Sequence, residues 1–347
     1  MYFITIDCGT TNSRVYIVDE EGNIHSKAAK HVGVRNTSMT GSRDCLEEGL
    51  RETVSEAVAQ SGIDRREFRA ILSSGMITSE IGLCEIPHLM APCDMATLAA
   101  NLTPVKNVRL TDFDIPVYFV RGIKNAMPEA VEDPFDLVGE LDFMRGEEAQ
   151  VAGLLARGKL ELPTTLVVLS SHTKFIPIGE RGEILGSLTT TSGQVHEAIL
   201  KQTFVGKSVE QPEGAEEEPE GYFDPDIVAK AAQWIRRGGI LRSMMLPRFL
   251  DVLLDTQWYQ RKHFYESLIA AEDMLAIGQL DHFDPVFRKR FVFVGLPGRC
   301  RLYEFVVRQN LPDAEVRSIS DAAEIDRLSI DGVLEIAKRA GIFDAQA

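Results

Sequence analysis

The stretch that decides the fold is Phe3-Ile-Thr-Ile-Asp7-Cys-Gly-Thr-Thr-Asn-Ser-Arg14-Val-Tyr-Ile-Val18, because a second stretch repeats its layout. The repeat is Leu166-Val-Val-Leu169-Ser-Ser-His-Thr-Lys174-Phe-Ile-Pro-Ile178. Each stretch is a short apolar run, a small polar loop and a second apolar run, followed by a glycine-containing reversal. Loops of Gly, Thr and Ser between strands leave backbone N–H groups and hydroxyls facing outward, where an anion can bind. The duplication predicts two β-hairpins, one at the head of each half, that hold a polyphosphate from two sides.

Composition and charge narrow the class of protein. A chain of 347 residues is long enough for two domains, each with its own core. The net charge of −15 argues against a nucleic-acid-binding surface. Five cysteines without a C-x-x-C pair predict reduced thiols, with neither a zinc site nor a disulfide framework. No apolar run approaches the length of a membrane span. We therefore expect a cytoplasmic protein with no membrane or nucleic-acid partner, and we leave a homodimer open.

Apolar periodicity predicts alternating strands and helices along the chain. The strands expected outside the two hairpins cover 28–34, 68–72, 116–120 and 290–294. The expected helices cover 44–60, 136–156, 194–202, 225–237, 261–277 and 296–309, and a last strand and helix close the chain. This alternation predicts an α/β architecture in two lobes. The N-terminal lobe would cover 1–155, with a C-terminal helix over 328–347 as a candidate to complete it, and the C-terminal lobe would cover 156–327.

One segment lacks any apolar periodicity. Residues 211–220 combine prolines, a glycine and a run of carboxylates. This composition predicts a mobile, solvated surface loop. An acidic interaction tag is the alternative interpretation.

The loop of the first hairpin, Asp7-Cys-Gly-Thr-Thr-Asn-Ser-Arg14, is the strongest local motif. Asp7 ends a strand, where its carboxylate could hold Mg²⁺. Gly9 lets the backbone approach a phosphate, Thr10 and Thr11 add hydroxyl donors, and Arg14 adds a planar cation. The alternative is a tight β-turn with a solvated aspartate.

The second candidate is Met144-Arg145-Gly-Glu147-Glu148-Ala-Gln150. Phosphoryl transfer to an alcohol needs a carboxylate that receives the hydroxyl proton. A glutamate beside an arginine, just before the second hairpin, is suitably placed for this role. A solvated Arg–Glu helix face explains the spacing equally well.

Two further features could bind a nucleotide. His172 and Lys174 lie in the loop of the second hairpin, where both could donate to phosphate oxygens. An exposed turn histidine and a surface lysine are the alternatives. The turn Gly295-Leu-Pro-Gly298 lies between a predicted strand and helix, where bare backbone could face an adenine ring or simply connect the two elements.

Taken together, these motifs resemble those of the 2-dehydro-3-deoxygalactonokinase family, in the sugar kinase, Hsp70 and actin superfamily. The segments that carry the resemblance follow the family's order over nearly the whole chain: 7–14, 74–77, 144–150, 171–174 and the stretch from 294 onward. The resemblance implies a two-lobed ribonuclease-H-like fold, related to actin-like ATPases, with the active site in the cleft between the lobes. It also implies ATP- and Mg²⁺-dependent phosphorylation of 2-dehydro-3-deoxy-D-galactonate to its 6-phosphate, a step of galactonate catabolism.

The resemblance also implies roles for individual residues. Related sugar kinases carry a Gly-Asp-Gln stretch whose aspartate is the catalytic base, which by analogy makes Glu147 the base, with Glu148 in reserve and Asp7 at the metal. The ATP contacts would come from Gly9, Thr10, Thr11, Asn12, Arg14, Ser170, Ser171, His172, Thr173, Lys174, Gly295 and Gly298. The sugar acid would be held by Ser74, Gly75, Met76 and Arg145.

The chain departs from the family pattern at several points. The family's second phosphate loop reads Gly-Thr-His-x-Lys-Trp, whereas this chain has Ser170, Ser171 and Phe175. A Thr-Gly-Glu segment appears as Ser192-Gly193-Gln194, and a Pro-Gly turn appears as Arg121-Gly122. Two rival functions remain at this point: a related ATPase or polyphosphate hydrolase whose acceptor is water, and a nucleotide-binding regulator without catalysis.

Overall fold

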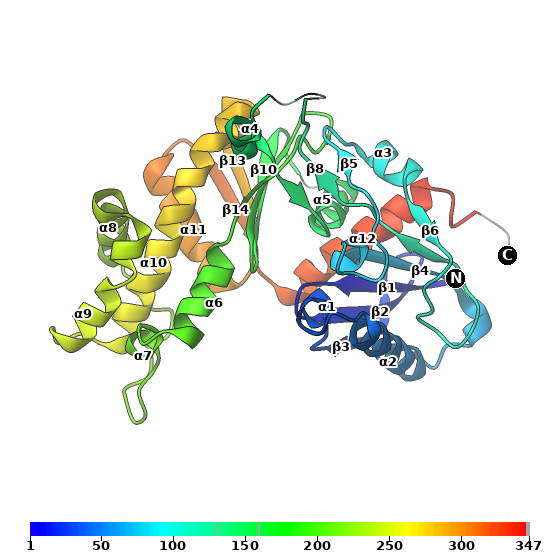
Figure 1. Ribbon diagram of the computed structural model, residues 1–347, viewed down its shortest axis with the longest axis horizontal. Helices are drawn as coiled ribbons and strands as arrows, with labels where there is room; N and C mark the ends of the chain where they lie inside the picture. Colours follow the sequence, from blue (N-terminus) through cyan, green and yellow to red (C-terminus); the bar gives the residue numbers. More distant parts are fainter. Residues whose placement is uncertain (129, 131, 159, 345–347) are drawn as a thin grey trace. The chain divides into compact units, whose positions relative to one another are not determined.

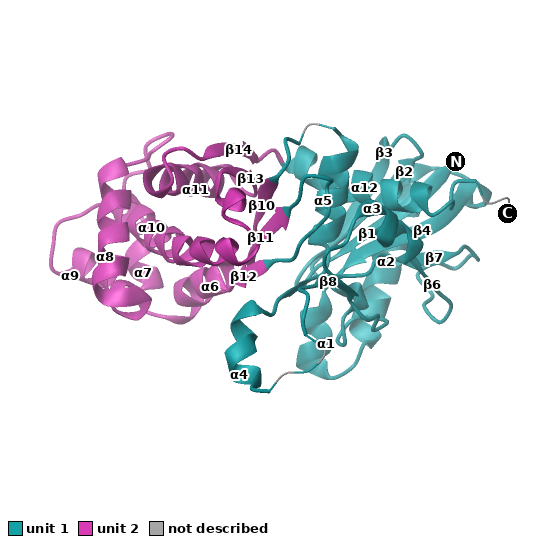
Figure 2. Ribbon diagram, turned by 90° about the horizontal axis from the view of Figure 1, so that it is seen from above, with its two compact units in different colours: residues 1–163, 178–187, 322–347 teal, residues 164–177, 188–321 magenta. Residues whose placement is uncertain are grey.

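The computed structural model, drawn in Figure 1, describes residues 1–128, 130, 132–158 and 160–344. The chain forms two compact units, coloured separately in Figure 2. Unit 1 comprises Met1–Pro163, Ile178–Ser187 and Ala322–Ala347, and unit 2 comprises Thr164–Pro177 and Leu188–Asp321. The predicted boundary after residue 155 falls inside helix α5 (Glu147–Ala156), and the chain instead passes from unit 1 to unit 2 at Pro163.

Unit 1 is built on a six-stranded sheet in the order β3-β2-β1-β4-β7-β6. The strands are β1 (Tyr2–Cys8), β2 (Ser13–Asp19), β3 (Ile24–Lys30), β4 (Phe68–Gly75), β6 (Thr103–Val105) and β7 (Val117–Phe119). β1, β2 and β3 are successively antiparallel, whereas β4 lies parallel to β1 and β7 lies parallel to β4. The predicted first hairpin is therefore confirmed, and the third strand begins earlier than the predicted 28–34.

Unit 2 repeats this arrangement in its own sheet, ordered β12-β11-β10-β13-β14. The strands are β10 (Thr164–Leu169), β11 (Thr173–Ile178), β12 (Leu188–Thr190), β13 (Arg290–Val294) and β14 (Glu315–Ile319). β11 and β12 are antiparallel, and β13 is parallel to both β10 and β14. The hairpin strands thus take the same positions in both sheets, which confirms the predicted duplicated, two-unit α/β fold.

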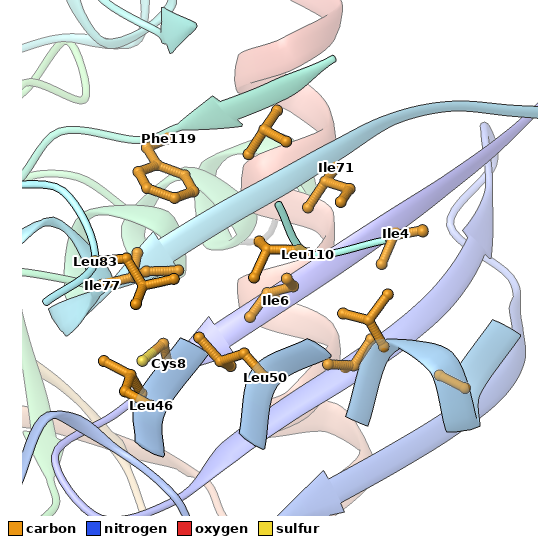
Figure 3. Packing of buried hydrophobic residues seen from close by; sticks show 14 of the residues in the cluster. Ile4, Ile6, Cys8, Leu46, Leu50, Ile71, Ile77, Leu83, Leu110 and Phe119 are labelled. Carbon is orange, nitrogen blue, oxygen red and sulfur yellow. The ribbon is translucent and has the colours of Figure 1, made fainter. Parts of the chain in front are cut away.

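The core of unit 1 lies between its sheet and helix α2 (Asp44–Ser61). Leu50 of α2 lies beside Ile6 of β1, and Leu46 lies beside Cys8, all of them buried, as Figure 3 shows. This helix has the bounds that its periodicity predicts, to within one residue. The other short elements of the unit are α1 (Val34–Thr40), α3 (Met95–Ala100), α4 (Pro134–Leu137) and the small sheet β5 (Leu89–Met90), β8 (Ile123–Lys124) and β9 (Phe143–Met144).

Helices α5 and α12 (Ala322–Arg339) pack closely together in unit 1. A Cβ atom on Gly153 would lie 2.0 Å from the Leu328 carbonyl oxygen, and one on Gly332 would lie 1.8 Å from that of Ala149. Only glycine allows this approach at the two crossing positions. Because α12 also packs on β1 and β4, it fixes α5 against the sheet.

The predicted continuous helix over 136–156 is wrong. The chain there forms α4, a 3₁₀ turn (Val138–Glu140), β9 and only then α5. Gly146 has a φ of +114°, outside the helical region, and it forces the chain to begin a new helix at Glu147. The apolar spacing of this segment misleads because Val138 and Leu141 are exposed.

The helices of unit 2 pack partly on its sheet and partly on one another. They are α6 (Ser192–Gln202), α7 (Gly206–Val209), α8 (Pro225–Ser243), α9 (Leu246–Val252), α10 (Trp258–Ile277) and α11 (Pro297–Asn310). The acidic segment 211–220 forms neither helix nor strand, as predicted. It is nevertheless tied to α10, because Trp258 Nε1 donates to the Glu216 carbonyl (2.8 Å) and Lys262 Nζ to Glu218 (2.9 Å).

Within the described ranges, no helix combines the length and apolar character needed to cross a membrane.

Candidate active site

Three motifs that are distant in the sequence meet at one edge of the sheet of unit 1. β1 and β4 are parallel and end together, with Asp7 beside Ser74 and Cys8 beside Gly75. A Cβ atom on Gly146 would lie 3.2 Å from Gly75 Cα, and one on Gly75 would lie 3.5 Å from Asp7 Oδ1. The first predicted loop, the substrate-side turn and the start of α5 therefore converge. The carboxyl ends of parallel strands are the usual location of ligand sites in open α/β sheets.

The loop after β1 is held with its carbonyl groups turned toward α1. The first backbone N–H groups of α1 donate to the carbonyl oxygens of Gly9 (3.3 Å) and Thr10 (2.9 Å). Gly9 N donates to the Asn12 carbonyl across the turn (3.0 Å). In the part of the chain that the structure describes, the N–H groups of Thr10, Thr11 and Asn12 donate to no protein acceptor. Successive backbone N–H groups of this kind can bind an anion.

Asp7 lies at the base of this loop. Its carboxylate is 3.4 Å from Arg14 Nη1, and the side chain is 35% exposed. Burial raises the pKa of Asp7 and the charge of Asp326 adds to this, whereas the Arg14 guanidinium lowers it. Among the described residues, no cluster of three or more His, Cys, Asp or Glu side chains could hold a metal ion. A single carboxylate still suits Mg²⁺, which usually takes one or two carboxylates together with water and phosphate oxygens.

The two neighbouring glutamates at the start of α5 differ in environment. Glu148 is fully buried, and both of its carboxyl oxygens accept from Gly146 N at 2.8 Å. Burial, and then the charge of Glu147, raise the pKa of Glu148 to about 8. Glu147 is only half-buried, at the first position of the helix. Glu147 is therefore the less buried of the two residues, although its Oε2 is itself buried.

The predicted substrate-side residues occupy unequal positions. Arg145 is half-buried, and its Nη1 donates to Thr78 Oγ1 (2.6 Å). Ser74 is 2% exposed, and Met76 packs against the hydrophobic core of unit 1. Gly75 has a φ of +94°, and a Cβ atom there would lie 2.5 Å from the Cys8 carbonyl oxygen. Of the four residues predicted to contact the acceptor, Arg145 is therefore the one whose side chain is suited to binding an anion.

The loop of the second hairpin lies in unit 2 and is fixed by Arg299 of α11. Arg299 Nη1 donates to the Ser170 carbonyl (2.7 Å), and Nη2 donates to Thr173 Oγ1 (2.8 Å) and Ser192 Oγ (3.2 Å). A Cβ atom on Gly193 would lie 2.2 Å from the Ser170 carbonyl oxygen, so α6 also approaches the loop closely. These contacts hold the loop in one conformation.

The predicted phosphate contacts in this loop are not equally accessible. Ser170 and Ser171 are exposed, and His172 is half-buried, with its carbonyl accepting from Ser170 Oγ at 2.9 Å. Thr173 is fully buried. Lys174 is 8% exposed, and its Nζ donates to Thr189 Oγ1 at 2.7 Å.

A cavity of about 560 Å³ opens in unit 2 beside this loop. Ser170, Ser171 and Gly298 line one part of it, and the side chains of α10 and of residues 218–223 line another. Gly295 lies against the end of β10, where a Cβ atom would be 2.8 Å from Leu169 Cβ. The cavity combines aromatic walls with the carboxylates Glu218 and Glu266, and its volume is typical of a small-molecule site. A nucleoside next to a phosphate-binding loop fits this arrangement.

The sequence interpretation missed three residues that shape these sites: Thr78, His88 and Arg299. Arg299 directly follows the Gly295–Gly298 turn, so its position could have drawn attention to it. His88 and Thr78 carry no motif, and only the fold brings them to Arg145.

The fold defines the class first: a duplicated α/β protein whose two units carry sheets of matching strand order. The chain belongs to the 2-keto-3-deoxy-galactonokinase family, whose model matches residues 7–326.

Individual relatives agree with this assignment. A protein of Rhizobium meliloti (strain 1021), named a probable 2-dehydro-3-deoxygalactonokinase, is 23% identical over 209 residues, which are 60% of this chain and 59% of the relative. The 2-dehydro-3-deoxygalactonokinase of Escherichia coli (strain K12) is 22% identical over 215 residues, which are 61% of each protein. The match therefore spans about three fifths of the length of these curated relatives.

A crystal structure from Sinorhizobium meliloti, given the same enzyme assignment, has a TM-score of 0.69 at 20% identity. The match covers 97% of this chain and 98% of that one, so the similarity in fold extends over both units.

Proposed function

We propose that this protein is an ATP-dependent sugar-acid kinase that phosphorylates the terminal hydroxyl of 2-dehydro-3-deoxy-D-galactonate in the cytoplasm, as a step of galactonate breakdown. The observation that carries the proposal is the convergence of Asp7, Gly75 and the start of α5 at one edge of the sheet of unit 1. Membership of the 2-keto-3-deoxy-galactonokinase family supports the choice of acceptor.

In this proposal Glu147 receives the proton of the acceptor hydroxyl as the new O–P bond forms and the bond between the γ-phosphorus and the leaving ADP breaks. A carboxylate in hydrogen-bond reach of the hydroxyl is the usual base for phosphoryl transfer to an alcohol. The half-buried position of Glu147 supports this role, whereas the full burial of Glu148 makes it a structural residue. ATP with Mg²⁺ supplies the phosphoryl group and neutralises its developing charge, and Asp7 would hold the metal.

Each unit carries its own donors for the phosphate groups of a nucleotide. The N–H groups of Thr10 to Asn12 and the exposed Arg14 guanidinium are donors for phosphate oxygens in unit 1. Ser170 and Ser171 offer donors in unit 2, beside a cavity of suitable size for adenosine. Arg299 would act on the nucleotide through the loop conformation that it maintains.

A coupled assay of ADP release, run with a panel of aldonic and keto-deoxy sugar acids, tests the proposal. We expect ADP release that depends on 2-dehydro-3-deoxy-D-galactonate, with a sugar phosphate as the product. Full ADP release from ATP alone would identify a hydrolase instead. ATP binding without turnover on any acid in the panel would identify a nucleotide-binding regulator.

A further inference from the structure

Arg145 is a half-buried cation without a carboxylate partner. Its Nη1 donates to Thr78 Oγ1 at 2.6 Å, and its Nη2 lies 3.5 Å from His88 Nδ1. Within the described residues, no Asp or Glu forms an ion pair with this guanidinium. A charge removed from water normally gains an opposite charge as well as hydrogen bonds. Arg145 has hydrogen bonds but lacks the opposite charge.

The neighbouring titratable groups leave this positive charge in place at neutral pH. Burial, and then the charge of Arg145, lower the pKa of His88 to about 4, so the imidazole is neutral. Glu148 has a pKa of about 8, so most of it is protonated at pH 7. Arg121 and Lys124 add positive charge nearby, and the carboxylates of Glu80 and Glu85 belong to exposed residues. Three cations, Arg145, Arg121 and Lys124, thus lie near His88 in a chain of net charge −15.

His88 supplies an independent observation. Its Nδ1 faces a guanidinium donor and therefore accepts, which leaves the hydrogen of the neutral ring on Nε2. Nε2 is buried, and it has no hydrogen-bond partner in the described part of the protein. Because leaving a buried donor unpaired costs free energy, a native structure normally provides a partner for it. An acceptor atom from a bound ligand would serve here.

Gly122 makes the contact between these two side chains possible. A Cβ atom on Gly122 would lie 2.7 Å from Arg145 Cγ and 2.9 Å from His88 Cδ2. Any larger residue would therefore push Arg145 and His88 apart. This requirement explains the glycine of the Arg121-Gly122 pair, which departs from the family pattern only at its first position.

We propose that Arg145 and His88 form the subsite for the acceptor's carboxylate and thereby select sugar acids over neutral sugars. This inference rests on the proposed function and deepens it. The guanidinium fork matches the two carboxylate oxygens, and Thr78 and His88 hold its plane in position. The carboxylate and the terminal hydroxyl are the two ends of the acceptor. Arg145 and Glu147, two residues apart, would bind one end each.

The test compares the acid with a neutral analogue in which a hydroxymethyl group replaces the carboxylate. For Arg145→Met we expect the KM for the acid to rise about 10-fold to 100-fold, the loss typical of a charged hydrogen bond. The KM for the neutral analogue should change little, so the preference for the acid collapses. Arg66→Met is the matched control, because Arg66 is exposed at the opposite end of β4 and should keep the wild-type preference.

Two conservative variants keep the test decisive if Arg145→Met does not fold. Arg145→Lys keeps the charge but loses the fork, and it should still weaken acid binding about 10-fold. His88→Asn keeps an acceptor near the Nδ1 position, whereas His88→Gln does not. Because His88 orients Arg145 through Nδ1 and offers Nε2–H to the ligand, each variant loses one of these two contacts, and both should raise the KM for the acid at similar kcat.

The possible outcomes separate the two proposals. An unchanged preference for the acid in folded Arg145→Met or Arg145→Lys, with wild-type turnover of the acid, would overturn the carboxylate subsite and leave the kinase proposal standing. Failure of the wild-type protein to phosphorylate any sugar acid would overturn both.

Discussion

Both carboxyl oxygens of Glu148 lie 2.8 Å from the backbone nitrogen of Gly146, two residues earlier in the chain. The side chain thus caps the start of its own helix, where the helix dipole favours a hydrogen-bond acceptor. Because the group is fully buried, its environment favours the protonated form. Glu147, next to it, is only half-buried.

The raised pKa of Glu148 makes stability depend on pH. The folded-state pKa of about 8 exceeds the ordinary glutamate pKa of 4.5, so between these two pH values the folded state holds a proton that the unfolded state has lost. Stability contributed by this group is therefore complete below pH 4.5 and is lost as the pH rises toward 8, at up to about 1.4 kcal/mol per pH unit.

The substitution Glu148→Gln should remove the part of the pH dependence of stability that this group causes. Urea unfolding at several pH values from 5 to 8 would measure how stability depends on pH. The variant should still fold, because a neutral amide can accept from Gly146 N. We expect the variant to lose less stability than the wild-type protein as the pH rises. An identical pH dependence in the two proteins would show that Glu148 is ionised in the folded state.

Asp7→Asn tests the first loop. If Asp7 holds Mg²⁺, its loss should lower kcat by about 10²-fold or more, since metal placement contributes much of the catalysis in phosphoryl transfer. The unfolding midpoint should stay near the wild-type value because Asp7 is 35% exposed. Asp112→Asn, an exposed change that breaks only a surface pair with Arg65, is the control. Near-normal turnover of folded Asp7→Asn would refute the metal assignment.

Arg299→Lys tests the second loop. The arginine donates to the Ser170 carbonyl and to two hydroxyls, a geometry that a lysine ammonium cannot reproduce. Titration calorimetry with a non-hydrolysable ATP analogue should give an affinity about 10-fold weaker. Arg308→Lys, on the same helix but in an exposed pair with Glu304, should bind like the wild-type protein. Equal affinities for the two variants would mean that the loop does not depend on Arg299.

The glycine crossing of α5 and α12 should be intolerant of side chains. Gly332→Ala places a Cβ atom 1.8 Å from a backbone oxygen, which the two helices can accommodate only by moving apart. Overpacking of this kind costs about 1–3 kcal/mol of unfolding free energy. Gly139→Ala is the matched control, since nothing lies within 4 Å of its Cβ position. Thermal unfolding midpoints of the two variants would be compared. Equal midpoints would contradict the close packing of α5 and α12.

Local sequence patterns predicted the parts of the fold that depend on neighbouring residues. The strand–loop–strand pattern from Phe3 to Val18 specifies a hairpin within its own length, and the spacing of Leu46 and Leu50 specifies a helix. The helix expected over 136–156 failed because a glycine with positive φ, at 146, overrides the apolar spacing.

Features that depend on distant contacts could not be predicted from these patterns. Arg145 and His88 are 57 residues apart, and Arg299 reaches Ser170 across 129 residues. The packing of Gly332 on Ala149 likewise depends on the tertiary fold. The resemblance to the Gly-Asp-Gln stretch already ranks Glu147 above Glu148, and the structure adds that Glu148 is fully buried whereas Glu147 is half-buried.

The turnover of Glu147→Gln and Glu148→Gln, measured side by side with 2-dehydro-3-deoxy-D-galactonate and ATP, tests the central claim most directly. Loss of a general base typically costs about 10²- to 10⁴-fold in rate, so we expect Glu147→Gln to lose most of its kcat while it still binds ATP. Glu148→Gln should stay within about 10-fold of the wild-type rate, because its amide keeps the contact with Gly146 N. The reverse ranking, or two fully active variants, would contradict the assignment of Glu147 as the base.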